Sequence, residues 1–210
     1  MSKLEDVSKA VEKGKLKEIE VIVDEALKDG AKAAEILDAM IEAMVVVGEQ
    51  FRVSEIFVPE MLMSAHTMKK AVAVIQPLLV EGATTSLGTC VIGTITGDLH
   101  DIGKNLVALM IESAGFKIVD LGVDVPAEKF IEAINAHDDC NLVALSCLLT
   151  TTMPALSKSV EGIIEAGLKE KVKIIVGGAP ITAEYAKQIG ADGTAEDAAS
   201  AAELAKTIVA

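Results

Sequence analysis

Apolar residues recur at helical spacing through the first part of the chain. Within residues 31–51, Ile36, Met40, Met44 and Val47 are three or four positions apart, which puts them on one side of a helix. Because the connections between such segments are short, the pattern predicts a small four-helix bundle. The other three predicted helices span residues 4–11, 15–27 and 59–75.

After residue 88 the pattern changes to short apolar runs that alternate with helical segments. Each run is apolar at nearly every position, which is typical of strands in a parallel sheet covered by helices on both faces. Five strand–helix repeats predict an α/β flavodoxin-like (Rossmann-like) domain with a five-stranded parallel sheet in the order 2-1-3-4-5. The predicted strands span residues 89–95, 116–121, 142–146 and 173–176, with a short fifth strand near 192–194.

A small and polar stretch separates the two patterns. Its sequence, Glu81-Gly82-Ala83-Thr84-Thr85-Ser86, is typical of a connection between domains. The sequence therefore predicts a helical bundle domain over residues 1–82, a linker over residues 83–88 and an α/β domain over residues 89–210, with residues 82–88 as a candidate hinge.

The composition indicates a chain with a buried core and an acidic surface. Of the 210 residues, 51% are hydrophobic, and the formal net charge is −13. This charge argues against nucleic acid or an anionic membrane as a partner, and no apolar run is long enough to span a bilayer. Three cysteines without a Cys-x-x-Cys spacing, and a start without the pattern of a signal peptide, predict reduced thiols and a cytoplasmic location.

One histidine lies where open α/β sheets bind their ligands. His100 follows the first predicted strand and precedes the next helix. Asp98, two residues upstream, can accept a hydrogen bond from one ring nitrogen, which leaves the other nitrogen free for a metal. The same residues also fit a helix-capping loop with an incidental histidine, so this pattern alone leaves both interpretations open.

Two further elements accompany this loop, and together they carry a resemblance. In chain order the three elements are Asp98-x-His100-x-x-Gly103, Ser146-x-Leu148 and Gly177-Gly178. Their order and separations resemble the signature of cobalamin-binding domains, the modules of methionine synthase and of the corrinoid proteins that serve methyltransferases. The resemblance extends over almost the whole chain, and it implies cobalamin as the cofactor.

The resemblance further implies cobalamin in the base-off/His-on form, with His100 as the metal ligand in place of the cofactor's lower base. The displaced tail would lie in a slot beside the ends of strands one, three and four. The α/β residues that the resemblance assigns to the cofactor are Asp98, His100, Asp101, Ile102, Gly103, Ser146, Leu148, Thr150, Thr152, Gly177 and Gly178.

The family extends the histidine–aspartate pair with a hydroxyl group into an axial relay. Aligned through the second element, that position is Thr152, where methionine synthase has serine, and Thr151 could substitute for it. Because methyl-Co(III) prefers an axial nitrogen and Co(I) binds none, the resemblance implies that His100 leaves cobalt and gains a proton on reduction. Asp98 would stabilise the imidazolium that forms.

The helical half resembles the module of methionine synthase that lies over the corrin. The likeness rests on the stretch Phe51-x-x-x-x-x-Phe57-Val58-Pro59-x-Met61. By this likeness the residues that cover the upper face of cobalt are Phe51, Phe57, Val58 and Met61. An apolar lid keeps water away from a reactive metal. Phe and Met are also ordinary core residues, and that interpretation stays open for each of them.

The family resemblance implies a stand-alone corrinoid protein that carries a methyl group. One partner, a substrate-specific methyltransferase, would methylate Co(I). A second, a methylcobalamin:carrier methyltransferase, would pass the methyl group from methyl-Co(III) to tetrahydrofolate or coenzyme M, and a reductive activation protein would be a third partner. The chemistry would come from the cofactor, with the protein non-catalytic alone. Methylamines, methanol, betaines and methoxylated aromatics are all served by similar proteins, so the methyl donor stays open.

Two other functions stay open at this point. A cobalamin-binding sensor or regulatory module resembles the same two-part architecture, although such regulators usually carry a basic DNA-binding domain. A flavodoxin-like domain that binds another nucleotide, or acts as a signalling receiver, needs no corrinoid. A corrinoid absorbs visible light, whereas this chain has no tryptophan and one tyrosine, so colour separates the last alternative from the others.

Overall fold

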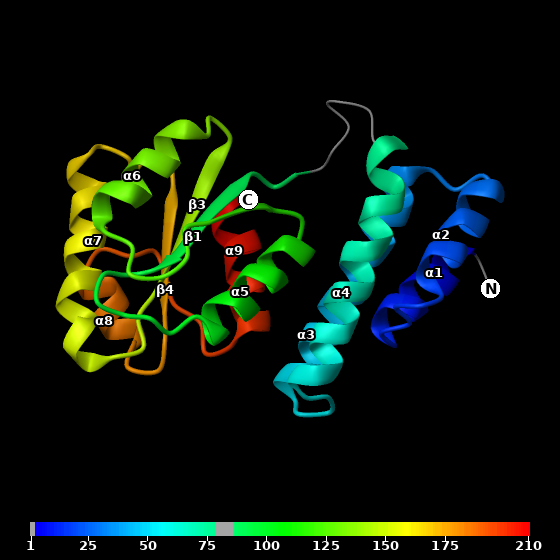
Figure 1. Cartoon of the computed structure of the whole chain (residues 1–210), viewed down its shortest axis with the longest axis horizontal. Helices are drawn as coiled ribbons and strands as arrows, with labels where there is room; N and C mark the ends of the chain where they lie inside the picture. Colours follow the sequence, from blue (N-terminus) through cyan, green and yellow to red (C-terminus); the bar gives the residue numbers. More distant parts are fainter. Residues whose placement is uncertain (1–2, 79–85) are drawn as a thin grey trace. The chain divides into compact units, whose positions relative to one another are not determined.

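The computed structural model describes residues 3–78 and 86–210, which belong to two compact units. The first unit is helical and the second is an α/β domain, in the order that the sequence predicts (Figure 1). The predicted linker over residues 83–88 lies partly outside the described residues. Within the described ranges, no helix is both long enough and apolar enough to cross a membrane.

The predicted helical N-terminal region is confirmed. Its described helices are α1 (Lys3–Glu12), α2 (Ile19–Lys28), α3 (Ala33–Arg52) and α4 (Val58–Ile75), followed by a 3₁₀ turn, η1 (Gln76–Leu78). Ile36, Met40 and Met44, the apolar stripe of α3, are buried as their spacing predicts. The Ser64 hydroxyl of α4 donates to the Glu12 carbonyl at the end of α1 at 3.1 Å, which ties the last helix to the first.

The start of α2 differs from the prediction, because the chain turns before the helix forms. Gly14 has a left-handed φ of 60°, and the Lys15 amide donates back to the Ala10 carbonyl at 2.9 Å. The helix therefore begins at Ile19 rather than at residue 15.

The second unit is a parallel sheet with helices on both faces. Its strands are β1 (Thr89–Thr94), β2 (Lys117–Asp120), β3 (Cys140–Ser146) and β4 (Lys173–Gly177), in the order β2-β1-β3-β4. Its helices are α5 (Ile102–Ser113), α6 (Ala127–Ala136), α7 (Met153–Glu165), α8 (Ala183–Gln188) and α9 (Ala198–Val209), with a 3₁₀ turn, η2 (Thr150–Thr152), before α7. Figure 1 shows α6 and α7 on one face of the sheet and α5 and α9 on the other.

Burial on both faces explains why β1 and β3 are apolar at nearly every position. Val91 of β1 and Leu145 of β3 belong to one buried core with Phe130 of α6 and Val160 of α7. Gly93 leaves room for the aromatic ring, because a β-carbon there would lie 2.9 Å from Cζ of Phe130. The core therefore fixes α6 closely against β1.

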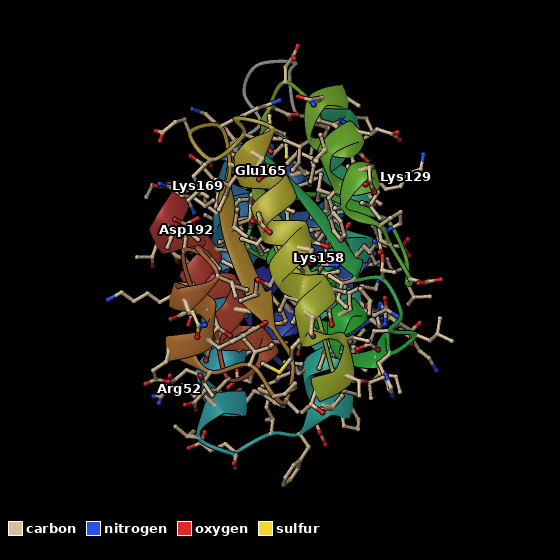
Figure 2. The ribbon with its side chains drawn as sticks, turned by 90° about the vertical axis from the view of Figure 1, so that its left-hand side faces the viewer. Arg52, Lys129, Lys158, Glu165, Lys169 and Asp192 are labelled. Carbon is tan, nitrogen blue, oxygen red and sulfur yellow. The ribbon has the colours of Figure 1, made fainter. Side chains whose placement is uncertain are left out.

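The prediction of a fifth strand is wrong, since the sheet has four strands among the residues that the structure describes. In the described chain, the segment near residues 192–194 forms one isolated parallel bridge, between Gly193 and Ile175 of β4. The Asp192 carboxylate accepts the Ile174 amide at 2.7 Å and the Lys169 ammonium at 2.6 Å (Figure 2). The Asp192 side chain thus accepts the Ile174 amide, which the backbone of a further strand would otherwise accept. The pairing with β4 therefore ends after one bridge.

Candidate functional site

Strand register brings the ends of three strands together at one edge of the sheet. Thr94 at the end of β1 pairs with Ser146 of β3, and Ser146 pairs with Gly177 of β4. The Ile95 amide donates to the Ser146 carbonyl at 3.1 Å, and the Cys147 amide donates to the Gly177 carbonyl at 2.9 Å. The loops that carry the three sequence elements therefore start side by side.

His100 lies on the loop between β1 and α5 and is held by Asp98. Its ring nitrogen Nδ1 is 2.7 Å from Oδ1 of Asp98, and its backbone amide donates to the same oxygen at 3.0 Å. The Thr94 hydroxyl donates to the His100 carbonyl at 2.8 Å. About half of the His100 side chain is exposed (52%). The loop is therefore fixed through its backbone and one ring nitrogen, while the imidazole stays accessible.

The Asp98 carboxyl group is fully buried (0% exposed). Burial alone would raise its pKa, but hydrogen bonds from the His100 amide and ring and from two leucine amides outweigh burial and lower the pKa to about 2. The Leu148 and Leu149 amides donate to Oδ2 at 2.7 and 3.2 Å. An ionised carboxylate only accepts hydrogen bonds, so Nδ1 of His100 carries a proton, and Nε2 of the neutral ring keeps its lone pair. His100 is therefore a nitrogen donor that Asp98 orients.

Exposed apolar side chains gather at the His100 loop. Leu99 and Ile102, on either side of the histidine, are 70% and 84% exposed, and Leu148 and Leu149 of the neighbouring loop are also exposed. A contiguous group of exposed apolar side chains is typical of a surface that a ligand or partner covers. The edge of the sheet therefore suits a broad ligand that is partly apolar.

Three polar residues of the predicted site differ in their bonding. Asp101 begins α5, since its carbonyl accepts the Asn105 amide at 2.7 Å and its carboxylate accepts the Asn105 side chain at 3.2 Å. For the hydroxyls of Ser146 and Thr150, the described residues provide no hydrogen-bond partner. These two hydroxyls are therefore available to a ligand, whereas Asp101 is engaged in the helix start.

The glycines of the predicted site have two kinds of surroundings. A β-carbon at Gly103 or Gly177 would meet nothing within 4 Å. At Gly178, whose φ is 133°, a β-carbon would collide with the Cys147 carbonyl oxygen. Gly178 is therefore required by the neighbouring loop of the protein itself, whereas Gly103 and Gly177 border open space.

Thr152 lies beside the Asp98 carboxylate, but its shorter hydrogen bond is to another acceptor. Its buried hydroxyl donates to the Leu149 carbonyl at 2.9 Å and, over a longer distance of 3.4 Å, to Oδ2 of Asp98. A hydroxyl has one proton to donate, so the shorter bond is the main one. The Cys147 sulfur is a further neighbour at 3.4 Å. Thr152 is thus near the pair without being its main partner, and the other candidate, Thr151, is exposed.

The four predicted lid residues of the helical unit differ in exposure. Phe57 is 66% exposed and Val58 is also exposed, whereas Phe51 is half-buried. Met61 is 1% exposed and lies on the same face of α4 as Ser64, which bonds to α1. The helical unit therefore presents Phe57 and Val58 at its surface and keeps Met61 in its interior.

Other residues that hold the His100 loop escaped the sequence analysis. The Asp124 carboxylate accepts the Gly97 amide at 2.7 Å, and the Asp124 amide donates to the Asp98 carbonyl at 3.0 Å. Backbone donors such as the Leu149 amide leave no signal in a sequence. Asp124 does leave one, because a carboxylate that follows a strand at the carboxyl edge of a parallel sheet is placed near the other loops of that edge.

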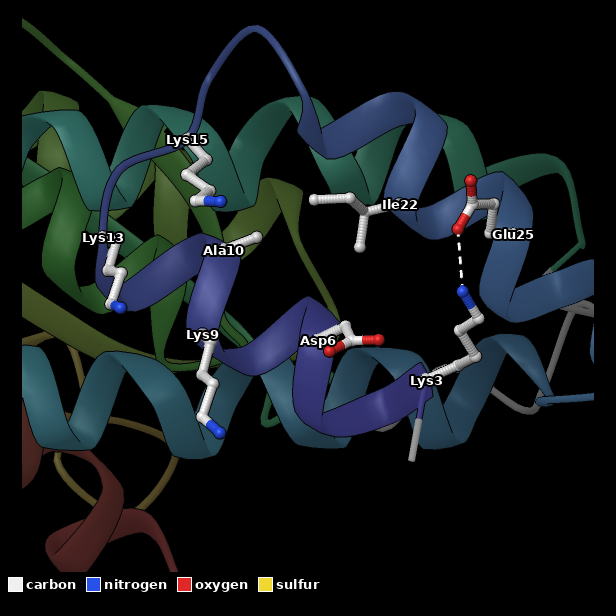
Figure 3. Close-up of a pocket in the computed structure, with 8 residues that line it drawn as sticks. All are labelled: Lys3, Asp6, Lys9, Ala10, Lys13, Lys15, Ile22 and Glu25. Carbon is white, nitrogen blue, oxygen red and sulfur yellow. Dashed lines mark hydrogen bonds and ion pairs between the residues drawn. The ribbon is translucent and has the colours of Figure 1, made fainter. Parts of the chain in front are cut away.

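A separate hollow of about 250 Å³ lies at α1 and α2 of the helical unit (Figure 3). Its lining consists of Lys3, Asp6, Lys9, Ala10, Lys13, Lys15, Ile22 and Glu25. Lys3 pairs with Glu25 at 2.8 Å, and Lys15 pairs with Glu18 at 3.2 Å. Exposed ion pairs of this kind are typical of solvated helix surfaces, so this hollow does not rival the His100 loop as a functional site.

The fold and the geometry define a class of site. An accessible imidazole, oriented by a buried carboxylate, lies at the carboxyl edge of a parallel sheet among exposed apolar side chains. A carboxylate–histidine pair of this kind presents nitrogen to a metal, and the apolar surroundings suit an organic ligand. Together these features make the His100 loop a candidate binding site for a metal-containing organic cofactor.

Comparison with known proteins identifies the family. Residues 88–203 and residues 3–76 each match a family described as B12 binding domain. The dimethylamine corrinoid protein of Methanosarcina barkeri is 39% identical over 209 residues, which cover 99% of this chain and 97% of the relative. The trimethylamine corrinoid protein of the same organism is 43% identical over 190 residues, which cover 89% and 87%. The chain belongs to the B12-binding family of corrinoid proteins.

A solved structure agrees with this assignment over nearly the full length. The crystal structure of the methanol:cobalamin methyltransferase complex from Methanosarcina barkeri contains a chain that superposes with a TM-score of 0.85 and 29% sequence identity. The match covers 99% of this chain and 79% of the other. The helical unit and the α/β unit thus occur together in a solved relative.

Proposed function

We propose that the protein is a corrinoid methyl carrier. It would accept a methyl group from a substrate-specific methyltransferase and deliver it to a methylcobalamin:carrier methyltransferase, with the methyl group held on the cobalt of bound cobalamin. Similarity to dimethylamine and trimethylamine corrinoid proteins favours a methylamine as the methyl donor. Similarity to a chain of a methanol:cobalamin methyltransferase complex supports a methyltransferase partner. A reductive activation protein completes the proposed set of partners.

One observation carries this proposal: Nδ1 of His100 is committed to a buried carboxylate while the ring stays accessible. Nε2 is then a neutral nitrogen donor, which suits cobalt. A corrin supplies the equatorial ligands itself, so one donor from the protein is enough. The exposed side chains of Leu99 and Ile102 fit the apolar edge of such a macrocycle. The residues present therefore fit a corrinoid.

For the binding mode we infer the base-off/His-on form, with Nε2 of His100 as the axial ligand. The displaced nucleotide tail would lie along the carboxyl edge of the sheet, where a β-carbon at Gly177 would meet nothing within 4 Å. The hydroxyls of Ser146 and Thr150 are available to hydrogen-bond it. Gly178 contributes by letting the chain pass the neighbouring loop rather than by facing the tail.

The His100–Asp98 pair also provides a place for a proton. When the ring is not bound to the metal it can take a proton at Nε2, and the ionised Asp98 then faces an imidazolium. Because the pKa of Asp98 is about 2, the carboxylate does not take that proton itself. The pair therefore stabilises the charged ring and holds the proton at Nε2, ready to be released when the nitrogen ligates again.

We further propose that the helical unit acts as a cap over the other face of the cofactor. Phe57 and Val58 would be the covering side chains, since both are exposed, whereas Phe51 is half-buried and Met61 is buried. Apolar cover excludes water from a reactive centre. Because a partner enzyme needs access to that face, the cap has to move during function.

A spectroscopic experiment tests the ligand assignment. The full-length protein is produced with histidine labelled with the heavy nitrogen isotope, and it is loaded with cob(II)alamin. In the EPR spectrum, ordinary axial nitrogen gives a triplet splitting, whereas the heavy isotope gives a doublet. We expect a doublet in the wild type and its loss in His100→Ala. A triplet in the labelled wild type would mean that the cofactor keeps its own base, and it would refute the base-off/His-on form.

A transfer experiment separates a carrier from a sensor. The protein is loaded with methylcobalamin and mixed with a methylcobalamin:coenzyme M methyltransferase and coenzyme M. A carrier is expected to lose its methyl group, which the visible spectrum of the corrinoid reports. A protein that binds methylcobalamin but keeps the methyl group with this enzyme, and also with a methyltransferase that uses tetrahydrofolate, would contradict the proposal.

A further inference from the structure

Lys104, in the first turn of α5, is a buried cation four residues after His100. Only 3% of Lys104 is exposed. Lysine is rarely buried without a partner, because it is costly to remove an ammonium group from water. A cation in the first turn of a helix also faces the positive end of the helix dipole. An apolar side chain at this position would avoid both costs, so we infer that Lys104 has a role besides packing.

Two side chains accept hydrogen bonds from the ammonium group. Nζ of Lys104 donates to Oδ2 of Asp120, at the end of β2, and to Oδ1 of Asn105 at 2.6 Å. The other oxygen of Asp120 accepts the Gly122 amide at 2.9 Å. The lysine therefore connects the first turn of α5 with the loop that follows β2.

That loop is itself bonded to the His100 loop. The Gly122 carbonyl accepts the Thr94 amide at 2.9 Å, and the Thr94 hydroxyl donates to the His100 carbonyl at 2.8 Å. On the other side of the histidine, the Asn105 side chain donates to the Asp101 carboxylate at 3.2 Å. The lysine thus belongs to a set of hydrogen bonds that reaches His100 from both sides.

We propose that Lys104 is a positioning residue, whose ion pair with Asp120 fixes the place from which the His100 imidazole ligates the cofactor. The inference rests on the proposed role of His100 as the axial ligand. In this proposal the hydrogen-bonded ion pair holds α5 and the loop after β2 in one arrangement, which an apolar contact between them would not do as well. Outer partners of a metal ligand act on metal binding in this way, through orientation.

The test compares Lys104→Met with a matched control, Lys169→Met. Lys169 pairs with Asp192 at 2.6 Å, and both side chains are partly buried (Figure 2). This pair lies near the start of β4, whereas the His100 loop follows the end of β1. Each full-length variant, with heavy-isotope histidine, is loaded with cob(II)alamin. EPR gives the ratio of histidine-bound to histidine-free cofactor, and urea unfolding of the cofactor-free protein gives its stability.

We expect the ratio of histidine-bound to histidine-free cofactor to fall about tenfold in Lys104→Met and to stay at the wild-type value in Lys169→Met. Asp120→Asn keeps the size of the partner and removes its charge, so it should also lower the ratio of histidine-bound to histidine-free cofactor. This variant replaces Lys104→Met in the test if Lys104→Met does not fold. Lys104→Arg retains a cation and should recover part of the ratio.

Two results would overturn the inference. One is a wild-type ratio in both Lys104→Met and Asp120→Asn, while the wild type shows histidine on cobalt. The other is an equal fall in Lys104→Met and Lys169→Met, which would indicate a general loss of stability. A wild type without the histidine signal would instead remove the proposed role of His100, and this inference with it.

Discussion

Asp98 and Asp192 lie toward opposite ends of one sheet and use their carboxylates in similar ways. Asp98 accepts several loop amides and Asp192 accepts one strand amide. Each also accepts from a basic side chain, His100 in one case and Lys169 in the other. The basic partners differ in what they leave free. The Lys169 ammonium also donates to the Gly190 carbonyl at 3.1 Å, whereas the His100 ring stays about half exposed.

This difference shows how one structural device serves two purposes. Toward the amino end of β4, Asp192 satisfies a strand amide and a lysine, and the sheet ends there. At the carboxyl edge, Asp98 accepts three loop amides and fixes an imidazole without covering it. A carboxylate that holds backbone amides is a feature of folding in both places. It becomes part of a binding site only where its basic partner keeps an atom available to a ligand.

Asp98→Asn is expected to have the largest effect among the changes that test this comparison. The amide keeps the size of the carboxylate but places an NH₂ group against donors, so a buried donor loses its partner. We expect the free energy of unfolding of the cofactor-free protein to fall by roughly 3–4 kcal/mol. For Asp192→Asn, whose ion pair is less buried, we expect a fall of about 1 kcal/mol. Urea titration followed by the fluorescence of Tyr185, the single tyrosine, measures both. Equal losses of unfolding free energy in the two variants would contradict the difference between Asp98 and Asp192.

The acid dependence of Asp98→Asn sharpens this prediction. The pKa of Asp98 is about 2 in the folded protein, below the ordinary value of about 3.9, so the unfolded state takes up a proton first as the pH falls. The stabilisation from the charged carboxylate is therefore complete above about pH 5 and is lost as the pH falls toward about 2. The gap in unfolding free energy between wild type and variant should narrow by about 2 kcal/mol between about pH 6 and about pH 2.5. A constant gap would show that the charge is not responsible.

Gly178→Ala and Gly177→Ala form a matched pair at the carboxyl edge. At Gly178 the new β-carbon would collide with the Cys147 carbonyl oxygen, and we expect a loss of roughly 2–3 kcal/mol in unfolding free energy. At Gly177 the β-carbon meets nothing, so stability should change by less than about 1 kcal/mol. Binding of hydroxocobalamin, measured by equilibrium dialysis, should weaken in Gly177→Ala because its methyl group enters the proposed slot.

The results for these two variants test whether Gly178 and Gly177 have different roles at the carboxyl edge of the sheet. If Gly178→Ala unfolds at the same urea concentration as the wild type, the collision with the Cys147 carbonyl does not constrain the loop. If Gly177→Ala binds hydroxocobalamin as tightly as the wild type, the open space beside Gly177 is not part of the slot. Either result would remove the distinction between the two neighbouring glycines.

Most of the fold could be predicted because its signals are local in the sequence. Near-continuous apolar runs indicated the four observed strands, and helical spacing indicated the helices on both sides of them. The fifth strand could not be excluded in this way, because its absence depends on a contact between distant residues, the Asp192 carboxylate and the Ile174 amide. Periodicity likewise placed Met61 on a helix but did not tell which face of that helix is buried.

In the candidate site, too, contacts that are local in the sequence could be predicted and contacts between distant residues could not. The hydrogen bond between Asp98 and His100 was predictable because the two residues are two positions apart in a tight loop. The Leu148 amide reaches the same carboxylate from fifty residues away, and a backbone donor has no side-chain signature. Lys104 did leave a signal, since a cation in the first turn of a helix opposes the helix dipole. That its partner is Asp120, at the end of β2, could not be predicted, because only the fold brings the two side chains together.

Thr152→Val has the smallest expected effect and tests whether the hydroxyl belongs to the Asp98 pair. The hydroxyl donates to the Leu149 carbonyl at 2.9 Å and lies 3.4 Å from Asp98, so the substitution removes a bond to the loop backbone and none of the main bonds to the carboxylate. We expect a loss of about 1 kcal/mol in unfolding free energy and the same acid dependence as the wild type. Thr150→Val, at an exposed position, is the control and should stay within about 0.5 kcal/mol.

The same urea titrations, carried out at acid pH, show whether the Thr152 hydroxyl forms a relay with Asp98 and His100 or only contacts the loop backbone. If the Thr152 hydroxyl supports the charge of Asp98, its removal raises the pKa of that carboxyl group toward the ordinary value. The variant would then keep less of its stability at neutral pH and lose less of it in acid, as Asp98→Asn does in larger measure. Parallel curves for Thr152→Val and the wild type would instead assign the ionised state of Asp98 to the His100 ring and the loop amides, and limit the threonine to holding the Leu149 carbonyl.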